Sequence, residues 1–288
     1  MAHVRRHITV LLLFAGLTAL ITYPQVTALG TSVPFHPDPY FAMWRLGWVA
    51  HELLGRPTQI FEANIFYPAH DTLAYSDAML LPGLLLAPFF RAGVHPVAIY
   101  NWSLLGSIVL SGLATFALVR RLTHETPTAV AAGVIYAFAP YRFDHYMHLE
   151  LQIVFWAPLA LLLVHRIVEA PGVGAGLALG ALVAAQGLSC LYVAIFLAMY
   201  CSVFVPALWA IEARRRTTRL AAALAVAAAV TLLALAPYAS AYTRATASVG
   251  TRTPQDVRHY GASAGSYVAA PPMNRLWGSR LSSFGADE

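Results

Sequence analysis

Seven hydrophobic stretches, most of them near the length of a membrane span, constrain this chain more than any other feature. A helix needs about 20 apolar residues to cross a bilayer, because it rises about 1.5 Å per residue. The stretches occupy residues 8–29, 97–119, 128–141, 151–168, 173–189, 191–211 and 219–240. They predict an all-α fold: a polytopic transmembrane helical bundle of about seven spans.

The composition also indicates that lipid forms part of the surroundings of this chain. Apolar residues make up 59% of the chain and charged residues 11%, whereas a soluble domain carries about a quarter charged residues. The net charge is +5, and the chain contains Arg but no Lys. No basic cluster is interleaved with aromatic residues, which argues against nucleic acid as a partner. Cys190 and Cys201 lack the spacing of metal ligands and read as small apolar residues.

The distribution of Arg predicts the orientation. If the spans alternate, half of the Arg residues fall on one side, before the first span and in the short connections, and the short connections on the other side carry only Arg142. The positive-inside rule then places the N-terminus in the cytoplasm of a bacterial inner membrane. We therefore expect a membrane module over 1–240 and a periplasmic tail over 241–288. The loop 30–96, the segment 142–150 and the tail would share the outer side.

The long outer loop carries two apolar segments of its own. Residues 39–54 are expected to form a helix, with Asp38 as its N-cap and Pro39 in its first turn. This helix is apolar and rich in Trp, which favours a position in the membrane interface. Residues 78–90 are too short to cross a bilayer alone and contain two prolines, so we expect an interfacial or re-entrant segment.

Two acidic residues of this loop are candidates for chemistry. Asp38 is either only a helix cap or a general base that also orients an acceptor hydroxyl at the membrane surface. Both roles are compatible only if one carboxylate oxygen remains free. Asp77, just before the second apolar segment, is either a cap or a second acidic site residue.

A second cluster of ionisable residues lies between two apolar stretches. It consists of Arg142, Asp144, His145, His148 and Glu150. If the segment is helical, Asp144 and His148 share one face. Ionisable groups at a bilayer edge are costly to place and commonly functional. Three interpretations remain open: a solvated connector, a phosphate site built on Arg142 and a histidine, and a divalent metal site using His145, His148 and a carboxylate.

The order of these motifs resembles the GT-C superfamily of polytopic glycosyltransferases, in particular the bacterial branch related to protein mannosyltransferases and lipid A aminoarabinose transferases. The resemblance covers roughly residues 1–170. It rests on His36-Pro37-Asp38-Pro39-Tyr40, Asn64-Ile65-Phe66-Tyr67-Pro68, Tyr75-Ser76-Asp77, Pro140-Tyr141-Arg142, His148 and Trp156-Ala157-Pro158-Leu159. Members of this superfamily use polyprenyl-phosphate sugars and usually have more spans, so the tail is expected to begin a region that continues in a longer protein.

The resemblance implies a function and assigns roles. Asp38 takes the place of the catalytic acidic residue of the first outer loop, and Arg142 and His148 are expected to contact the donor phosphate. The expected reaction moves a sugar from a polyprenyl-phosphate donor in the membrane to an acceptor hydroxyl at the periplasmic face, with no soluble cofactor required. The alternative is a non-enzymatic transporter, flippase or assembly subunit for lipid-linked saccharides. The nearly charge-free spans favour the enzyme, because transporters place ionisable groups near mid-span.

Overall fold

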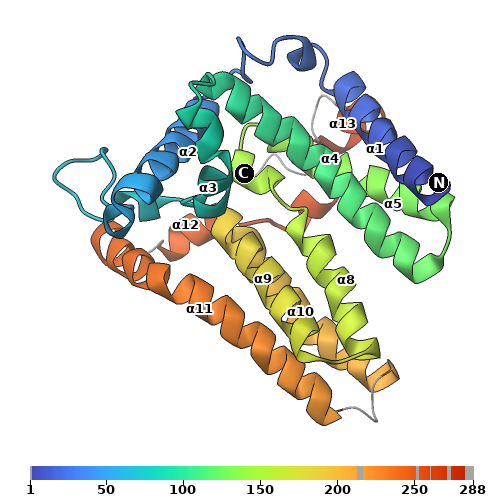
Figure 1. Ribbon diagram of the computed structural model, residues 1–288. Coiled ribbons are helices and arrows are strands. Elements are labelled where there is room, and N and C mark those ends of the chain that lie inside the picture. Colours follow the sequence, from blue (N-terminus) through green and yellow to red (C-terminus); the bar gives the residue numbers. More distant parts are fainter. Residues whose placement is uncertain (1, 213–216, 251–252, 260, 271–273, 283–288) are drawn as a thin grey trace. The chain divides into compact units, whose positions relative to one another are not determined.

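The computed structural model describes residues 2–212, 217–250, 253–259, 261–270 and 274–282. Every regular element within these residues is helical (Figure 1). Contacts divide the chain into a first unit, Met1–Tyr242, and a second, Thr243–Glu288. The helices that begin in the first unit are α1 (Ala2–Ile21), α2 (Pro37–Gly55), α3 (Leu80–Arg91), α4 (Pro96–Thr123), α5 (Thr126–Ala137), α6 (Pro140–Asp144), α7 (Leu149–Gln152), α8 (Trp156–Glu169), α9 (Val173–Ser189), α10 (Leu191–Glu212) and α11 (Thr217–Val249).

Four helical segments are long and apolar enough to cross a membrane. They are Pro96–Thr123, Leu149–Glu169, Leu191–Ile211 and Thr218–Val249, and Arg6–Ile21, Leu80–Arg91 and Val173–Ser189 are shorter apolar helices. The expectation of an all-helical chain compatible with several membrane crossings is confirmed, whereas the number seven stays a prediction. The stretch 128–141 shows the difficulty, because α5 has 12 residues and so is only about 18 Å long.

Helix α4 packs against α5, α1 and α8. Phe14 of α1 is fully buried, and its ring lies against Gly112 of α4 and Gly133 of α5. A side chain at either glycine would occupy the space of that ring. Small residues on two helices therefore make room for one aromatic side chain on a third.

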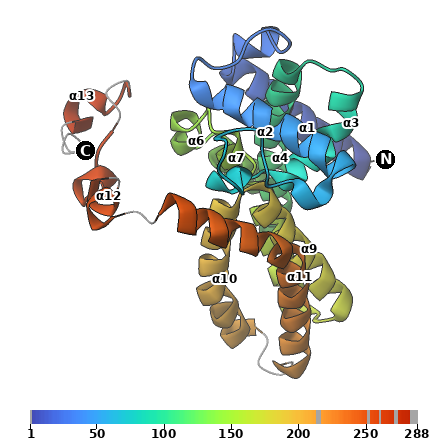
Figure 2. The same ribbon diagram turned by 90° about the vertical axis from the view of Figure 1, so that its left-hand side faces the viewer.

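Helices α8 to α11 form a second packed group. Buried residues of all four helices, among them Ala160, Leu179, Leu197 and Ala223, meet in one apolar cluster. Figure 2 shows α9, α10 and α11 lying side by side. Gly176 and Gly180 of α9 lie close to the backbone of α11, at Ala223 and Ala227. This contact agrees with close helix packing as the reason for the glycines in this stretch.

The long loop 30–96 is folded onto the neighbouring helices. The two apolar segments expected at 39–54 and 78–90 are α2 and α3, which pack on each other. Ala42 and Leu46 of α2 join Tyr100 of α4 and Leu149 of α7 in one buried cluster. The loop therefore shares a buried core with α4 and α7.

One local expectation is wrong, and one condition set on the segment 142–150 is not met. The N-cap of α2 is His36, whose side chain accepts a hydrogen bond from the Asp38 amide, and α2 begins at Pro37. Proline suits this first position, and Asp38 therefore lies in the first turn of the helix. The segment 142–150 is not one helix either, because α6 ends at Asp144 and α7 begins at Leu149. Asp144 and His148 therefore do not share a helical face.

The second unit contains short elements: α12 (Pro254–His259), a 3-10 turn at Gly265–Tyr267 and α13 (Gly278–Leu281). At the start of α12, Thr253 and Asp256 exchange side-chain and backbone hydrogen bonds of 2.8 and 3.1 Å. This is the reciprocal pattern of a capping box. Parts of the expected tail lie outside the described residues.

Candidate functional site

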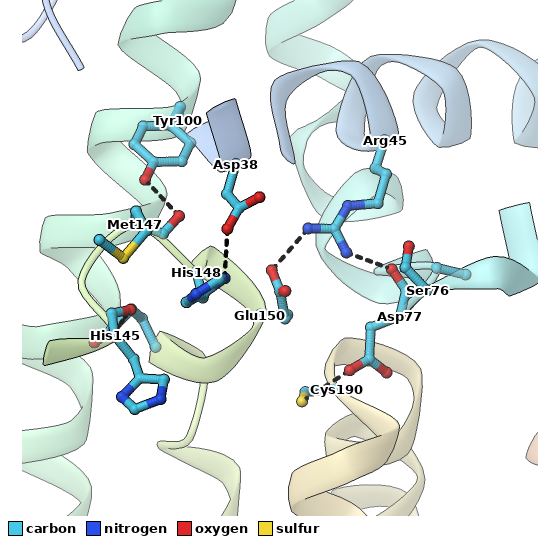
Figure 3. A network of polar contacts seen from close by, with 12 residues as sticks. Asp38, Arg45, Ser76, Asp77, Tyr100, His145, Met147, His148, Glu150 and Cys190 are labelled. Atoms are coloured by element: carbon cyan, nitrogen blue, oxygen red, sulfur yellow. Dashed lines mark hydrogen bonds and ion pairs between the residues drawn. The ribbon is translucent and has the colours of Figure 1, made fainter. Parts of the chain in front are cut away.

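Asp38 and His148, which are far apart in the chain, meet at the surface of the first unit (Figure 3). Nδ1 of His148 lies 2.8 Å from Oδ2 of Asp38. The side chains are 33% and 29% exposed, so both are supported by the fold and remain reachable from outside. Asp38 lies in the first turn of α2, and His148 is the residue that directly precedes α7.

The surroundings of Asp38 leave one of its oxygens open. Nδ1 of His36 is 3.3 Å from Oδ2 of Asp38, but the same nitrogen accepts the Asp38 amide at 3.3 Å. A nitrogen that accepts the amide cannot also donate to the carboxylate, so we regard His148 as the side-chain partner of Asp38. Oδ1 has no partner among the described contacts. The condition for combining a structural and a chemical role is therefore met.

A buried ion pair lies beside this contact. Nη2 of Arg45 is 2.7 Å from Oε2 of Glu150, and Nη1 of Arg45 donates to the backbone oxygen of Asp77 at 2.8 Å. Arg45 is 2% exposed at its side chain and Glu150 is 17% exposed. Phe41 stacks over the guanidinium at 4.6 Å from its ring centre. Arg45 of α2 thus contacts Asp77, three residues before α3, and Glu150 of α7.

Asp77 caps a helix other than its own. Its Oδ1 accepts the amide of Leu191, the first residue of α10, at 2.7 Å, and its Oδ2 accepts from the Cys190 thiol at 3.2 Å. Burial raises the pKa of the Asp77 carboxyl above its ordinary value, and the Leu191 amide, the thiol and Arg45 offset only part of that effect. Burial and the neighbouring Asp77 also raise the pKa of the Cys190 thiol. These directions fit a structural joint between the loop and α10.

Arg142 lies inside the protein, only 5% exposed. Its Nε and Nη2 donate to the side-chain and backbone oxygens of Gln152 at 3.1 and 2.8 Å. The Gln152 amide nitrogen donates in return to the backbone oxygens of Arg142 and His145. Burial lowers the pKa of Arg142 to about 10, so the guanidinium stays charged at neutral pH. Arg142 holds the ends of the segment carrying His148 together, and among the described contacts it does not reach Asp38.

Of the two remaining candidate residues, His145 borders the site and Asp144 does not. The His145 ring lies 5.8 Å from that of His148 and is stacked on Tyr141, so it borders the site. Asp144 is exposed at the end of α6 and makes none of these contacts. Within the described part of the chain, no group of three His, Cys, Asp or Glu side chains is arranged to hold a metal ion. The metal interpretation of this segment therefore has no ligand set there.

Sequence reasoning overlooked several residues that build the site. Arg45 was one basic residue on an apolar helix, and its pairing with Glu150 spans 105 residues of chain. Tyr100 of α4 donates to the backbone oxygen of Met147 at 3.1 Å and so fixes the residue before His148. His36 stood in the motif with Asp38, and a histidine before Pro37 was a usable signal for the cap.

A family model described as "Domain of unknown function (DUF6311)" matches residues 41–279. The chain belongs to the DUF6311 family. The matched segment includes Arg45, Asp77, His148 and Glu150, and Asp38 lies just before it. No curated protein and no solved structure matches this DUF6311 chain.

Proposed function

We propose that this DUF6311 protein is a membrane glycosyltransferase that moves a sugar from a polyprenyl-phosphate donor to an acceptor hydroxyl. One observation carries the proposal: the half-buried Asp38 carboxylate is held through one oxygen by His148, with its other oxygen open. A general base needs a fixed position and a free lone pair within reach of substrate. The resemblance to GT-C enzymes and the apolar helices around the site support a lipid-linked donor.

In the proposed reaction Oδ1 of Asp38 accepts the proton of the acceptor hydroxyl. The hydroxyl oxygen forms a bond to the anomeric carbon while the bond from that carbon to the phosphate oxygen breaks. Both electrons of the broken bond leave with the polyprenyl phosphate. His148, donating through Nδ1 to Asp38, has Nε2 available for a phosphate oxygen when the ring is protonated, and His145 lies beside it.

Arg142 has a different role in this scheme from the expected phosphate contact. Its guanidinium is engaged with Gln152, so we propose that it fixes the segment carrying His148 and acts on the donor only through that segment. Arg45 and Glu150 are proposed to hold α2, and hence Asp38, against the same segment. Asp77 positions α10 and takes no part in proton transfer.

We further propose that the protein lies in a bacterial inner membrane with its N-terminus in the cytoplasm. The Arg-rich connections support this orientation. Asp38 and His148 would then face the periplasm, together with α2 and α3. We propose that the shorter helices α1, α5 and α9 also cross the membrane, which together with the four long segments makes about seven spans.

The test is transfer by purified protein in lipid nanodiscs. Synthetic polyprenyl-phosphate sugars are supplied as donors, and the release of free polyprenyl phosphate is followed by thin-layer chromatography. We expect Asp38→Asn to lower release by about 100-fold or more, because general-base catalysis contributes about 10²–10⁴-fold. The matched control is Glu62→Gln, which alters an exposed carboxylate that also pairs with a histidine, His70, at 2.9 Å.

The expected result is full turnover in Glu62→Gln and loss in Asp38→Asn at equal thermal stability. Turnover in Asp38→Asn at the unaltered rate would remove the proposed base. If the unaltered protein releases polyprenyl phosphate from none of the donors but moves a labelled lipid-linked saccharide between leaflets, the flippase alternative would be favoured.

A further inference from the structure

A basic cavity lies near the ends of three helices, away from the Asp38 site. It has a volume of about 630 Å³ and opens between the start of α1 and the ends of α4 and α8. Its basic lining residues are Arg6, His7, Arg120, Arg121, His124 and Arg166. Arg120 follows Tyr100 by 20 residues on α4, so the cavity lies about 30 Å along that helix from the Asp38 site. That distance is close to the thickness of a bilayer's hydrocarbon core.

The charge of this cavity is only partly neutralised. Arg121 is paired with Glu169. Arg6, Arg120 and Arg166 have no carboxylate partner among the ion pairs of the described residues. The ends of α4 and α8 each add roughly half a negative charge, which does not balance three guanidinium groups. The cavity therefore presents a net positive charge to whatever occupies it.

The rest of the lining is apolar. In this respect the cavity differs from a helix end that carries only basic side chains. Leu113 and Phe116 of α4 and Leu162 of α8 lie deeper along their helices than Arg120 and Arg166. A free anion would use only the basic rim. A ligand with a charged head and an apolar body would use both parts of the lining.

We propose that this cavity binds an anionic phospholipid. Its phosphate would lie at Arg120 and Arg166, and the part of an acyl chain next to the headgroup would lie along Leu113 and Leu162. Guanidinium groups form paired hydrogen bonds with phosphate oxygens, and basic pockets between membrane helices suit anionic headgroups. The site is distinct from the Asp38 site and does not depend on the proposed transfer reaction. A bound lipid would tie α1, α4 and α8 together.

The first test uses the unaltered full-length chain in neutral detergent. Its thermal unfolding midpoint is measured with added phosphatidylglycerol, with phosphatidylcholine of the same acyl chains, and with inorganic phosphate. We expect an upward shift with phosphatidylglycerol only, since a ligand that binds the folded state raises its stability. Equal shifts with both lipids would overturn the proposal, and so would an equal shift with inorganic phosphate, which would make the site one for free phosphate.

A second test assigns the binding to the cavity. Arg120→Gln with Arg166→Gln removes two of its charges, and Arg91→Gln with Arg219→Gln removes two exposed charges outside it. Binding of phosphatidylglycerol is measured by native mass spectrometry. We expect the first pair to weaken binding about thirtyfold and the second pair to change it little. Equal weakening by the two pairs would show that the lipid is held by overall charge, which contradicts a site here.

Discussion

At the scale of single residues, the candidate site depends on side chains that support one another. Asp38 pairs with His148. Glu150, two residues after His148, pairs with Arg45. Truncating Glu150 would leave the buried Arg45 charge without its partner, and such losses are typically larger than the net gain from the pair itself. The ion pair therefore fixes the geometry of the site, and removing one of its two partners is expected to lower stability as well.

Asp77 leads to a prediction about pH. Its raised pKa means that the folded state binds a proton more readily than the unfolded state, so its contribution to stability falls as pH rises from about 4 through the raised value. Asp77→Asn keeps an oxygen for the Leu191 amide and cannot ionise. We expect the unfolding midpoint of the unaltered protein to decrease relative to Asp77→Asn as pH is raised from about 4 to 7.

The measurement is a series of thermal melts in detergent across that pH range. Asp144→Asn, which changes an exposed carboxylate on α6, is the matched control. A difference between the unaltered protein and Asp77→Asn that is constant with pH would show that Asp77 ionises as readily in the folded state as in the unfolded chain, and a difference that changes in the opposite direction would show that it ionises more readily.

At the scale of helices, close approach of backbones replaces the hydrophobic effect as the source of packing inside a membrane. A Cβ at Gly180 of α9 would lie 2.6 Å from the backbone oxygen of Ala227 and 2.7 Å from Cβ of Val230, both on α11. Thr231 of α11 also donates to the Gly180 backbone oxygen at 3.2 Å. The α9–α11 contact therefore depends on the absence of a side chain at this position.

Gly180→Ala should lower stability by about 1–3 kcal/mol, because the added methyl group overpacks the contact with α11. Gly174→Ala is the control: no other atom lies within 4 Å of its added Cβ, and alanine has the higher helix propensity. Thermal melts of both variants provide the comparison. Equal midpoints for the two would mean that α9 and α11 separate enough in the membrane to admit a side chain.

At the scale of the whole molecule, the proposed orientation places the outer loop and the basic cavity on opposite sides of the membrane. His70→Cys marks the loop, where the side chain is 82% exposed, and Thr123→Cys marks the exposed end of α4. We expect a membrane-impermeant maleimide to label position 70 in intact spheroplasts and position 123 only after lysis. The unsubstituted chain, with Cys190 buried and Cys201 half-buried, is the control. Labelling of both positions in intact spheroplasts, or the reverse order, would contradict the orientation.

Much of the architecture could be predicted from the sequence, but not its details. Apolar runs located every long helix, because membrane length imposes a simple pattern. The break between Asp144 and Leu149 was not visible in that pattern, and neither was the shortness of α5. The break depends on tertiary contacts: Gln152 holds the turn by accepting from Arg142 and donating to its backbone, an exchange no local propensity encodes.

By itself the sequence determined that the elements are helices long and apolar enough to cross a membrane, because long runs with few charges suit lipid when a helix satisfies their backbone polar groups internally. Only the tertiary structure decided which ionisable residues meet. His148 pairs with Asp38 and Arg142 is engaged with Gln152, although both were expected to contact the donor phosphate. The reason is that contacts across distant segments follow from how α2, α4 and α7 pack, and many packings are compatible with one hydrophobic pattern.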